Sequence, residues 1–90
     1  MAKVHDIDKT EIDNRIEKEI SDRLQVSRSD FDDNTPFEEP PLNAESLDII
    51  ELAETIDMEL GIFIPDDHLE QMETVGDAKS YIYNELDIAE

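Results

Sequence analysis

The residue of this chain best placed for chemistry is Ser46, at the start of a segment with helical apolar spacing. A serine acts as a catalytic nucleophile when a base and an oxyanion hole lie beside it. Its neighbours, Glu45 and Leu47, do not form the Gly-x-Ser-x-Gly pattern. The histidines are His5, in an expected loose end, and His68, in an expected short helix. The sequence therefore disfavours catalysis at Ser46.

A structural role is the simplest interpretation of Ser46. Serine is a favoured residue at the N-cap of a helix, where it contributes about 1 kcal/mol of stability. Asn43 is a rival cap, and it would place Ser46 in the first turn instead. The position of Ser46, taken alone, favours a helix cap.

A run of carboxylates gives a partial calcium-binding pattern. Asp30, Asp32 and Asn34 match positions one, three and five of an EF-hand loop. Thr35 stands where the loop needs glycine, and Pro41 stands where it needs glutamate, so an EF-hand is rejected. Because the chain has no cysteine, zinc–cysteine sites and disulfides are excluded as well. No specific metal site is expected.

The element that must position Ser46 is an amphipathic helix, expected over residues 44–60. Its apolar residues recur at spacings of three and four, which is typical of a helix with one buried face: Ile49, Leu52, Ala53, Ile56 and Leu60. Carboxylates occupy half of the remaining positions, so the opposite face is strongly anionic. Gly61 is well placed to end the helix, because glycine adopts the left-handed conformation without a steric clash.

Three further helices are expected around this one. A capping box at Asp8 and Glu11, followed by isoleucines every four residues, predicts a helix over 9–24. Pro65 starts a short helix with Leu69 and Met72 facing inward, and Thr74 caps a fourth helix with Asp77 completing the box. That last helix is lined by Val75, Ala78, Ile82 and Leu86.

The segment from Gln25 to Asn43 is rich in proline, serine and asparagine, which predicts a long loop. Four apolar residues are spaced so that they could pin it to the helices: Val26, Phe31, Phe37 and Leu42. The predicted fold is all-α, a small four-helix bundle of three longer helices and one short helix with a long ordered first loop. Residues 1–90 are expected to form a single domain, with 1–7 and 87–90 as loose ends.

The charge is extreme and unevenly distributed. The 90 residues contain 26 acidic and 7 basic residues, a net charge of −19, and residues 29–78 contain no lysine or arginine. Such a surface repels nucleic acid and anionic membranes but attracts basic protein patches. With no signal-peptide core and no apolar run of about 20 residues, a cytoplasmic monomer without membrane insertion is expected.

Three segments resemble the acyl carrier protein family of the free-standing type. Residues 45–52, with Glu45-Ser46-Leu47, resemble the family's modification site, and residues 60–67 and 74–78 match two further segments in the same order. The resemblance implies that the protein is a carrier and not an enzyme, and that a phosphopantetheinyl transferase attaches 4′-phosphopantetheine to Ser46. The arm would carry acyl groups as thioesters to acyl-processing enzymes of fatty acid or specialised lipid and polyketide biosynthesis.

The sequence departs from the family's modification site in three places. Glu45 replaces the usual aspartate, Asn43 stands where glycine is usual, and the Pro40-Pro41 pair is atypical. A carrier dedicated to a specialised pathway would fit these departures.

The resemblance also implies a docking face on the second helix for partners with basic patches. The residues that it assigns to this face combine apolar anchors with carboxylates that steer a partner: Leu47, Asp48, Ile50, Glu51, Glu54, Asp57 and Met58. The simpler alternative is an ordinary solvated helix face.

An acyl chain could enter a gap between the helices if apolar residues line it. The candidates are Ile49, Ala53, Ile56, Ile64, Leu69 and Ile82. A plain packed core is the alternative. Phe63 is compatible either with an exposed apolar contact or with a narrower gap.

A function of another class is an unmodified acidic helical module that binds a basic protein partner or mimics nucleic acid. A carrier of aminoacyl or polyketide units is a third hypothesis.

Overall fold

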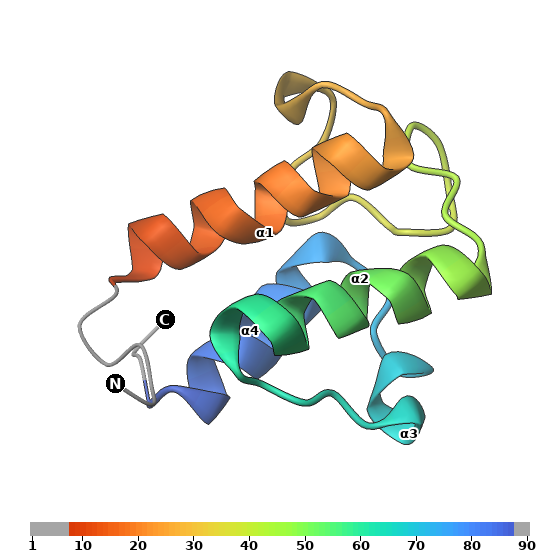
Figure 1. Cartoon of the computed structure of the whole chain (residues 1–90). Coiled ribbons are helices and arrows are strands. Elements are labelled where there is room, and N and C mark those ends of the chain that lie inside the picture. The colour runs from red at the N-terminus through yellow and green to blue at the C-terminus, as the bar shows by residue number, and fades with distance from the viewer. Residues whose placement is uncertain (1–7, 88–90) are drawn as a thin grey trace.

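The computed structural model describes residues 8–87, and within them it contains helices and no strands (Figure 1). The longer helices are α1 (Lys9–Leu24), α2 (Ser46–Leu60) and α4 (Val75–Glu85). The shorter elements are α3 (Asp66–Leu69) and a 3₁₀ helix, η1 (Arg28–Asp30). The predicted all-α bundle of three longer helices and one short one is confirmed, while η1 was not predicted. The expected loose ends, 1–7 and most of 87–90, lie outside the described residues.

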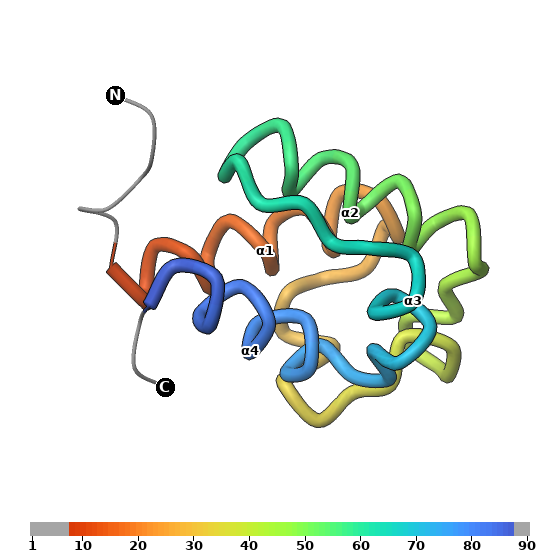
Figure 2. The backbone as a smooth tube through the Cα atoms, turned by 90° about the horizontal axis from the view of Figure 1, so that it is seen from below, coloured from red at the N-terminus to blue at the C-terminus, as the bar shows by residue number. Residues whose placement is uncertain are grey.

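Helix α1 forms as its sequence predicts. The Asp8 carboxylate caps it by accepting a hydrogen bond from the Glu11 N–H at 2.9 Å. Ile12, Ile16 and Ile20 are almost completely buried, and α1 packs against both α2 and α4. Figure 2 shows these helices side by side, with α3 near the N-terminal half of α2.

Helix α2 begins at Ser46 rather than at residue 44, which corrects the predicted boundary. Asn43 has a φ of 48°, in the left-handed region, and the N–H of Ala44 donates to the Phe37 carbonyl at 2.7 Å. Glu45, with φ −95° and ψ 167°, has an extended backbone, so the helix does not reach back to residue 44. At the other end Gly61, with φ 70°, donates its N–H to the Asp57 carbonyl, so the predicted stop is confirmed.

The first loop is packed down, as its spaced apolar residues predict. Phe37 and Leu42 are buried, and Val26 and Phe31 pack against the core. Hydrogen bonds join the loop to the start of α4: the Phe37 N–H donates to the Glu73 carbonyl, and the Val75 N–H donates to the Thr35 carbonyl.

A buried lysine fixes the same loop to two helices. Lys79 on α4 is 3% exposed, and its ammonium lies 2.6 Å from a Glu17 oxygen and 2.7 Å from an Asp33 oxygen. Burial lowers the pKa of Lys79, but its hydrogen bonds to Asp33 and Glu17 outweigh burial and raise that pKa above its ordinary value. Burial raises the pKa of Glu17, but hydrogen bonds from Lys79 and Arg28 prevail and lower it. The triad joins α1, the first loop and α4.

Candidate functional site

Ser46 is the first residue of α2, and its side chain is exposed. The cap position belongs to Glu45, which has extended backbone and accepts the first helical hydrogen bond, from the Ile49 N–H at 3.2 Å. Asp48 reaches back to accept from the Glu45 N–H at 2.9 Å. The cap interpretation of Ser46 is therefore wrong, and so is Asn43 as a rival cap. The Ser46 hydroxyl makes no hydrogen bond within residues 8–87.

The N-terminus of α2 offers backbone donors next to this hydroxyl. The N–H groups of Ser46 and Leu47 precede the first intrahelical hydrogen bond, and they lie at the positive end of a 15-residue helix. Such a terminus favours an anionic group.

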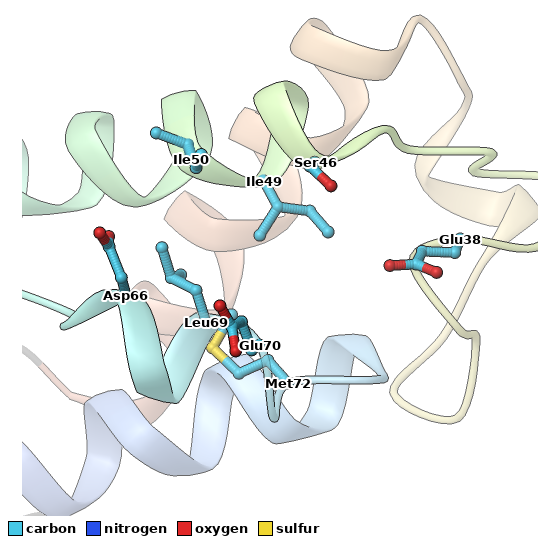
Figure 3. A pocket seen from close by; sticks show the side chains of 8 residues that line it. All are labelled: Glu38, Ser46, Ile49, Ile50, Asp66, Leu69, Glu70 and Met72. Atoms are coloured by element: carbon cyan, nitrogen blue, oxygen red, sulfur yellow. The ribbon is translucent and has the colours of Figure 1, made fainter.

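A cavity of about 330 Å³ opens beside Ser46, between α2 and α3 (Figure 3). Its lining is mostly apolar, from α2 and from the segment of α3 and the residues after it: Ile49, Ile50, Leu69 and Met72. Three carboxylates, Glu38, Asp66 and Glu70, also line it. The volume lies within the range of ligand-binding pockets, roughly 300–1,000 Å³.

The residues expected to line an acyl-chain gap are all buried, but they divide among different places. Ile49 and Leu69 line the cavity beside Ser46, and Ala53 and Ile64 line a neighbouring hollow that Leu69 shares. Ile56 faces the contact between α1 and α2, and Ile82 is fully buried in the core.

Sequence reasoning did not identify the other lining residues. Glu38 comes from the first loop, whose sequence has no periodic pattern from which its path over the helices could be predicted. Met72 was expected to face inward but was given no site role. Asp66 begins α3 and Glu70 caps its end, and this helix is too short for its sequence to show which face is exposed.

The residues of the expected docking face differ in how accessible they are. Leu47, Ile50 and Met58 are exposed, at 62%, 40% and 85%, and Glu54 and Asp57 are exposed as well. Asp48 and Glu51 are half-buried. Glu51 accepts a hydrogen bond from Arg23 of α1 at 3.0 Å, so an internal cation already offsets its charge.

His5 lies outside the described residues, and within residues 8–87 no histidine lines the cavity beside Ser46 as a base for nucleophilic catalysis. The centroid of the His68 ring lies 4.2 Å from that of the Tyr81 ring, and His68 does not line the cavity beside Ser46.

Among residues 8–87 no group of three or more His, Asp and Glu side chains is arranged to hold a metal ion. Within the same residues, no helix has the length and apolar character needed to cross a membrane.

Comparison with known proteins gives a consistent family. The family model described as a phosphopantetheine attachment site matches residues 14–82, which include Ser46. A protein named acyl carrier protein from Lactobacillus acidophilus is 42% identical over 72 residues, covering 80% of this chain and 89% of the relative. A protein of the same name from Zymomonas mobilis is 44% identical over 68 residues, covering 76% and 86%.

Proposed function

Because this chain belongs to the acyl carrier protein family, whose members are carriers with a 4′-phosphopantetheine prosthetic group, we propose that this group is attached through the Ser46 hydroxyl. The observation that carries this assignment is the exposed, unbonded Ser46 hydroxyl at the start of α2, at the edge of an apolar cavity.

The residues around Ser46 fit a phosphodiester anion. The free N–H groups of Ser46 and Leu47 can donate to phosphate oxygens, and the helix dipole favours negative charge there. Asp48 is the carboxylate of the first turn, and its hydrogen bond from the Glu45 N–H reduces its repulsion of the anion.

The departures at Asn43 and Glu45 are compatible with attachment. Asn43 occupies a left-handed conformation, which asparagine tolerates better than most residues other than glycine. Glu45 needs no capping side chain of its own, because the Asp48 carboxylate ties the Glu45 backbone to the first turn. Asn43 can therefore take the place of glycine without a change of backbone path.

The arm, when bound, supplies a terminal thiol that holds an acyl group as a thioester. Ile49, Ile50, Leu69 and Met72 would contact the apolar part of that cargo in the cavity. Each methylene that these residues remove from water would contribute about 0.8 kcal/mol. This contribution favours acyl chains as cargo, in fatty acid or specialised lipid and polyketide biosynthesis.

The exposed face of α2 would dock the partner enzymes, including the phosphopantetheinyl transferase. Leu47, Ile50 and Met58 provide apolar contacts, and Glu54 and Asp57 provide attraction to basic patches. Because salt screens exposed charges over about 8 Å, the complexes would be weak and exchangeable, as a carrier requires.

The test is the intact mass of the protein after incubation with coenzyme A and a broad-specificity phosphopantetheinyl transferase. We expect the mass to rise by one phosphopantetheine in the wild type and in Ser29→Ala, which removes another exposed serine. Ser46→Ala should gain nothing. An equal gain in Ser46→Ala would refute the assignment, and no gain in any folded variant would favour the unmodified interaction module.

A further inference from the structure

Phe63 is an aromatic residue displayed to solvent from an otherwise buried segment. It is 67% exposed, whereas its neighbours Ile62 and Ile64 are 5% and 3% exposed. The alternation is that of an extended backbone, in which successive side chains point to opposite faces. The Tyr81 hydroxyl donates to the Phe63 carbonyl at 3.2 Å, so the ring projects from an anchored backbone.

Phe63 and Ile50 line a common hollow in the surface, of about 120 Å³, between α2 and the segment that follows it. Buried Ala53 also lines this hollow, which we name the Phe63 hollow. It adjoins the cavity beside Ser46, because Ile50, Asp66 and Leu69 line both. An enzyme that reaches the Ser46 hydroxyl along α2 would therefore cover it.

The size and charge of the Phe63 hollow define what it can bind. Its volume is well below the range of small-molecule pockets, roughly 300–1,000 Å³, and suits a single side chain. Three exposed carboxylates line it, from Glu54, Asp57 and Asp66, and none makes an ion pair within residues 8–87. The complementary surface is one apolar side chain surrounded by lysines or arginines.

We propose that the Phe63 hollow is a docking subsite for an apolar side chain on the basic surface of the phosphopantetheinyl transferase that acts at Ser46. This subsite deepens the proposed function and rests on it for the identity of the partner. Phe63 lies outside the docking face expected from sequence, so it adds an anchor from the loop after α2.

Equilibrium binding tests the proposal without relying on modification of Ser46. A broad-specificity transferase is titrated into full-length protein carrying Ser46→Ala, with or without Phe63→Ser. We expect Phe63→Ser to raise Kd by about five- to tenfold, the loss typical of a buried interface anchor. Phe63→Leu keeps an apolar side chain and should recover most of the affinity.

Asn84→Ser is the control, because Asn84 is exposed on α4, outside the docking face, and does not line the hollow. It should change Kd by less than Phe63→Ser does. The Phe63→Ser ratio should be the same at low and moderate salt, whereas the effect of Asp57→Asn should shrink as salt rises. Circular dichroism and thermal unfolding establish that each variant is folded.

Two results would overturn the proposal: a Kd for folded Phe63→Ser within twofold of its parent, or no binding of the parent to the transferase. Failure of the proposed function gives a different result, because it is recorded as no mass gain at Ser46 even where the transferase binds.

Discussion

At the scale of single residues, Lys79 is a buried cation that neutralises two carboxylates of an anionic chain. It is the only basic residue after position 28, and it is buried against Glu17 and Asp33 instead of facing solvent. The described surface after residue 28 is therefore left without an exposed lysine or arginine. Burial of Lys79 could not be predicted from the sequence, because its partners Glu17 and Asp33 lie 62 and 46 residues away along the chain.

Replacement of Lys79 by methionine should destabilise the protein by about 1–3 kcal/mol, because it leaves two facing carboxylates without their cation. The free energy of unfolding in urea measures this effect. Lys18→Met is the matched control, since Lys18 and Asp22 form an exposed pair, which should contribute much less to stability than the buried Lys79 does. Equal losses in the two variants would contradict the role given to the triad.

Glu19 gives a prediction about pH. Burial raises the pKa of Glu19, and the hydrogen bond with Glu59 and the negative charge of Glu59 raise it further. A carboxyl group whose pKa is raised in the folded state destabilises the protein when the group is ionised. The folded protein therefore becomes more stable as the pH falls through that pKa. Glu19→Gln should therefore raise the free energy of unfolding at pH 7 by about 0.5 kcal/mol, and Tm should rise with it.

The gain from Glu19→Gln should disappear below about pH 4, where the unfolded-state carboxyl is protonated as well. Thermal unfolding across pH 3–8 follows it. A gain that persists at low pH would mean that the effect is not electrostatic.

At the scale of elements, periodicity and capping chemistry were sufficient to predict the four α-helices, although not every boundary. Asp8 and Thr74 cap as expected, and the isoleucines of α1 are buried. The start of α2 was placed two residues early, because residue 44 could join a helix by propensity. Its hydrogen bond to Phe37, a residue seven positions away across a loop, is a tertiary effect.

The cavity beside Ser46 was harder to predict than the helices. Burial of Ile49 and Leu69 follows from helical spacing, but the space between them depends on how α3 sits against α2. Four residues of α3 carry too little periodic signal to fix that packing. The same limit explains why Ile56 and Ile82, which share the apolar pattern, belong to the core instead.

Gly61 tests the end of α2. Because its φ is 70° and an added Cβ would meet nothing within 4 Å, Gly61→Ala should cost only the left-handed backbone penalty, about 1–2 kcal/mol. Gly61→Asn should cost less, since asparagine tolerates this conformation. Urea unfolding compares the two variants, and an asparagine variant less stable than the alanine variant would contradict this explanation.

At the scale of the whole molecule, repulsion among carboxylates opposes the compact state. The net charge is −19, and residues 29–78 contribute 16 acidic residues with no lysine or arginine. Self-repulsion of this kind is relieved by screening. The interpretation of residues 1–90 as one domain stays a proposal, and a single cooperative transition in calorimetry would support it.

Added sodium chloride or magnesium chloride should raise Tm, with a larger effect from magnesium at equal concentration because the divalent ion screens more strongly. Scanning calorimetry at neutral pH measures this. A Tm that falls with moderate salt would show that attractive ion pairs such as Lys79 with Glu17, and not net repulsion, dominate the electrostatics.

The central claim is that the Ser46 hydroxyl carries the phosphopantetheine arm. Its most direct test is peptide-level tandem mass spectrometry of the transferase-treated wild-type protein, which locates the added group on the chain without a substitution. The protein is cleaved after glutamate, because residues 29–78 have no lysine or arginine and Glu45 separates Ser29 from Ser46. The account predicts the group on the peptide that contains Ser46 and on no peptide that contains Ser21, Ser27, Ser29 or Ser80. A modified peptide without Ser46 would contradict it.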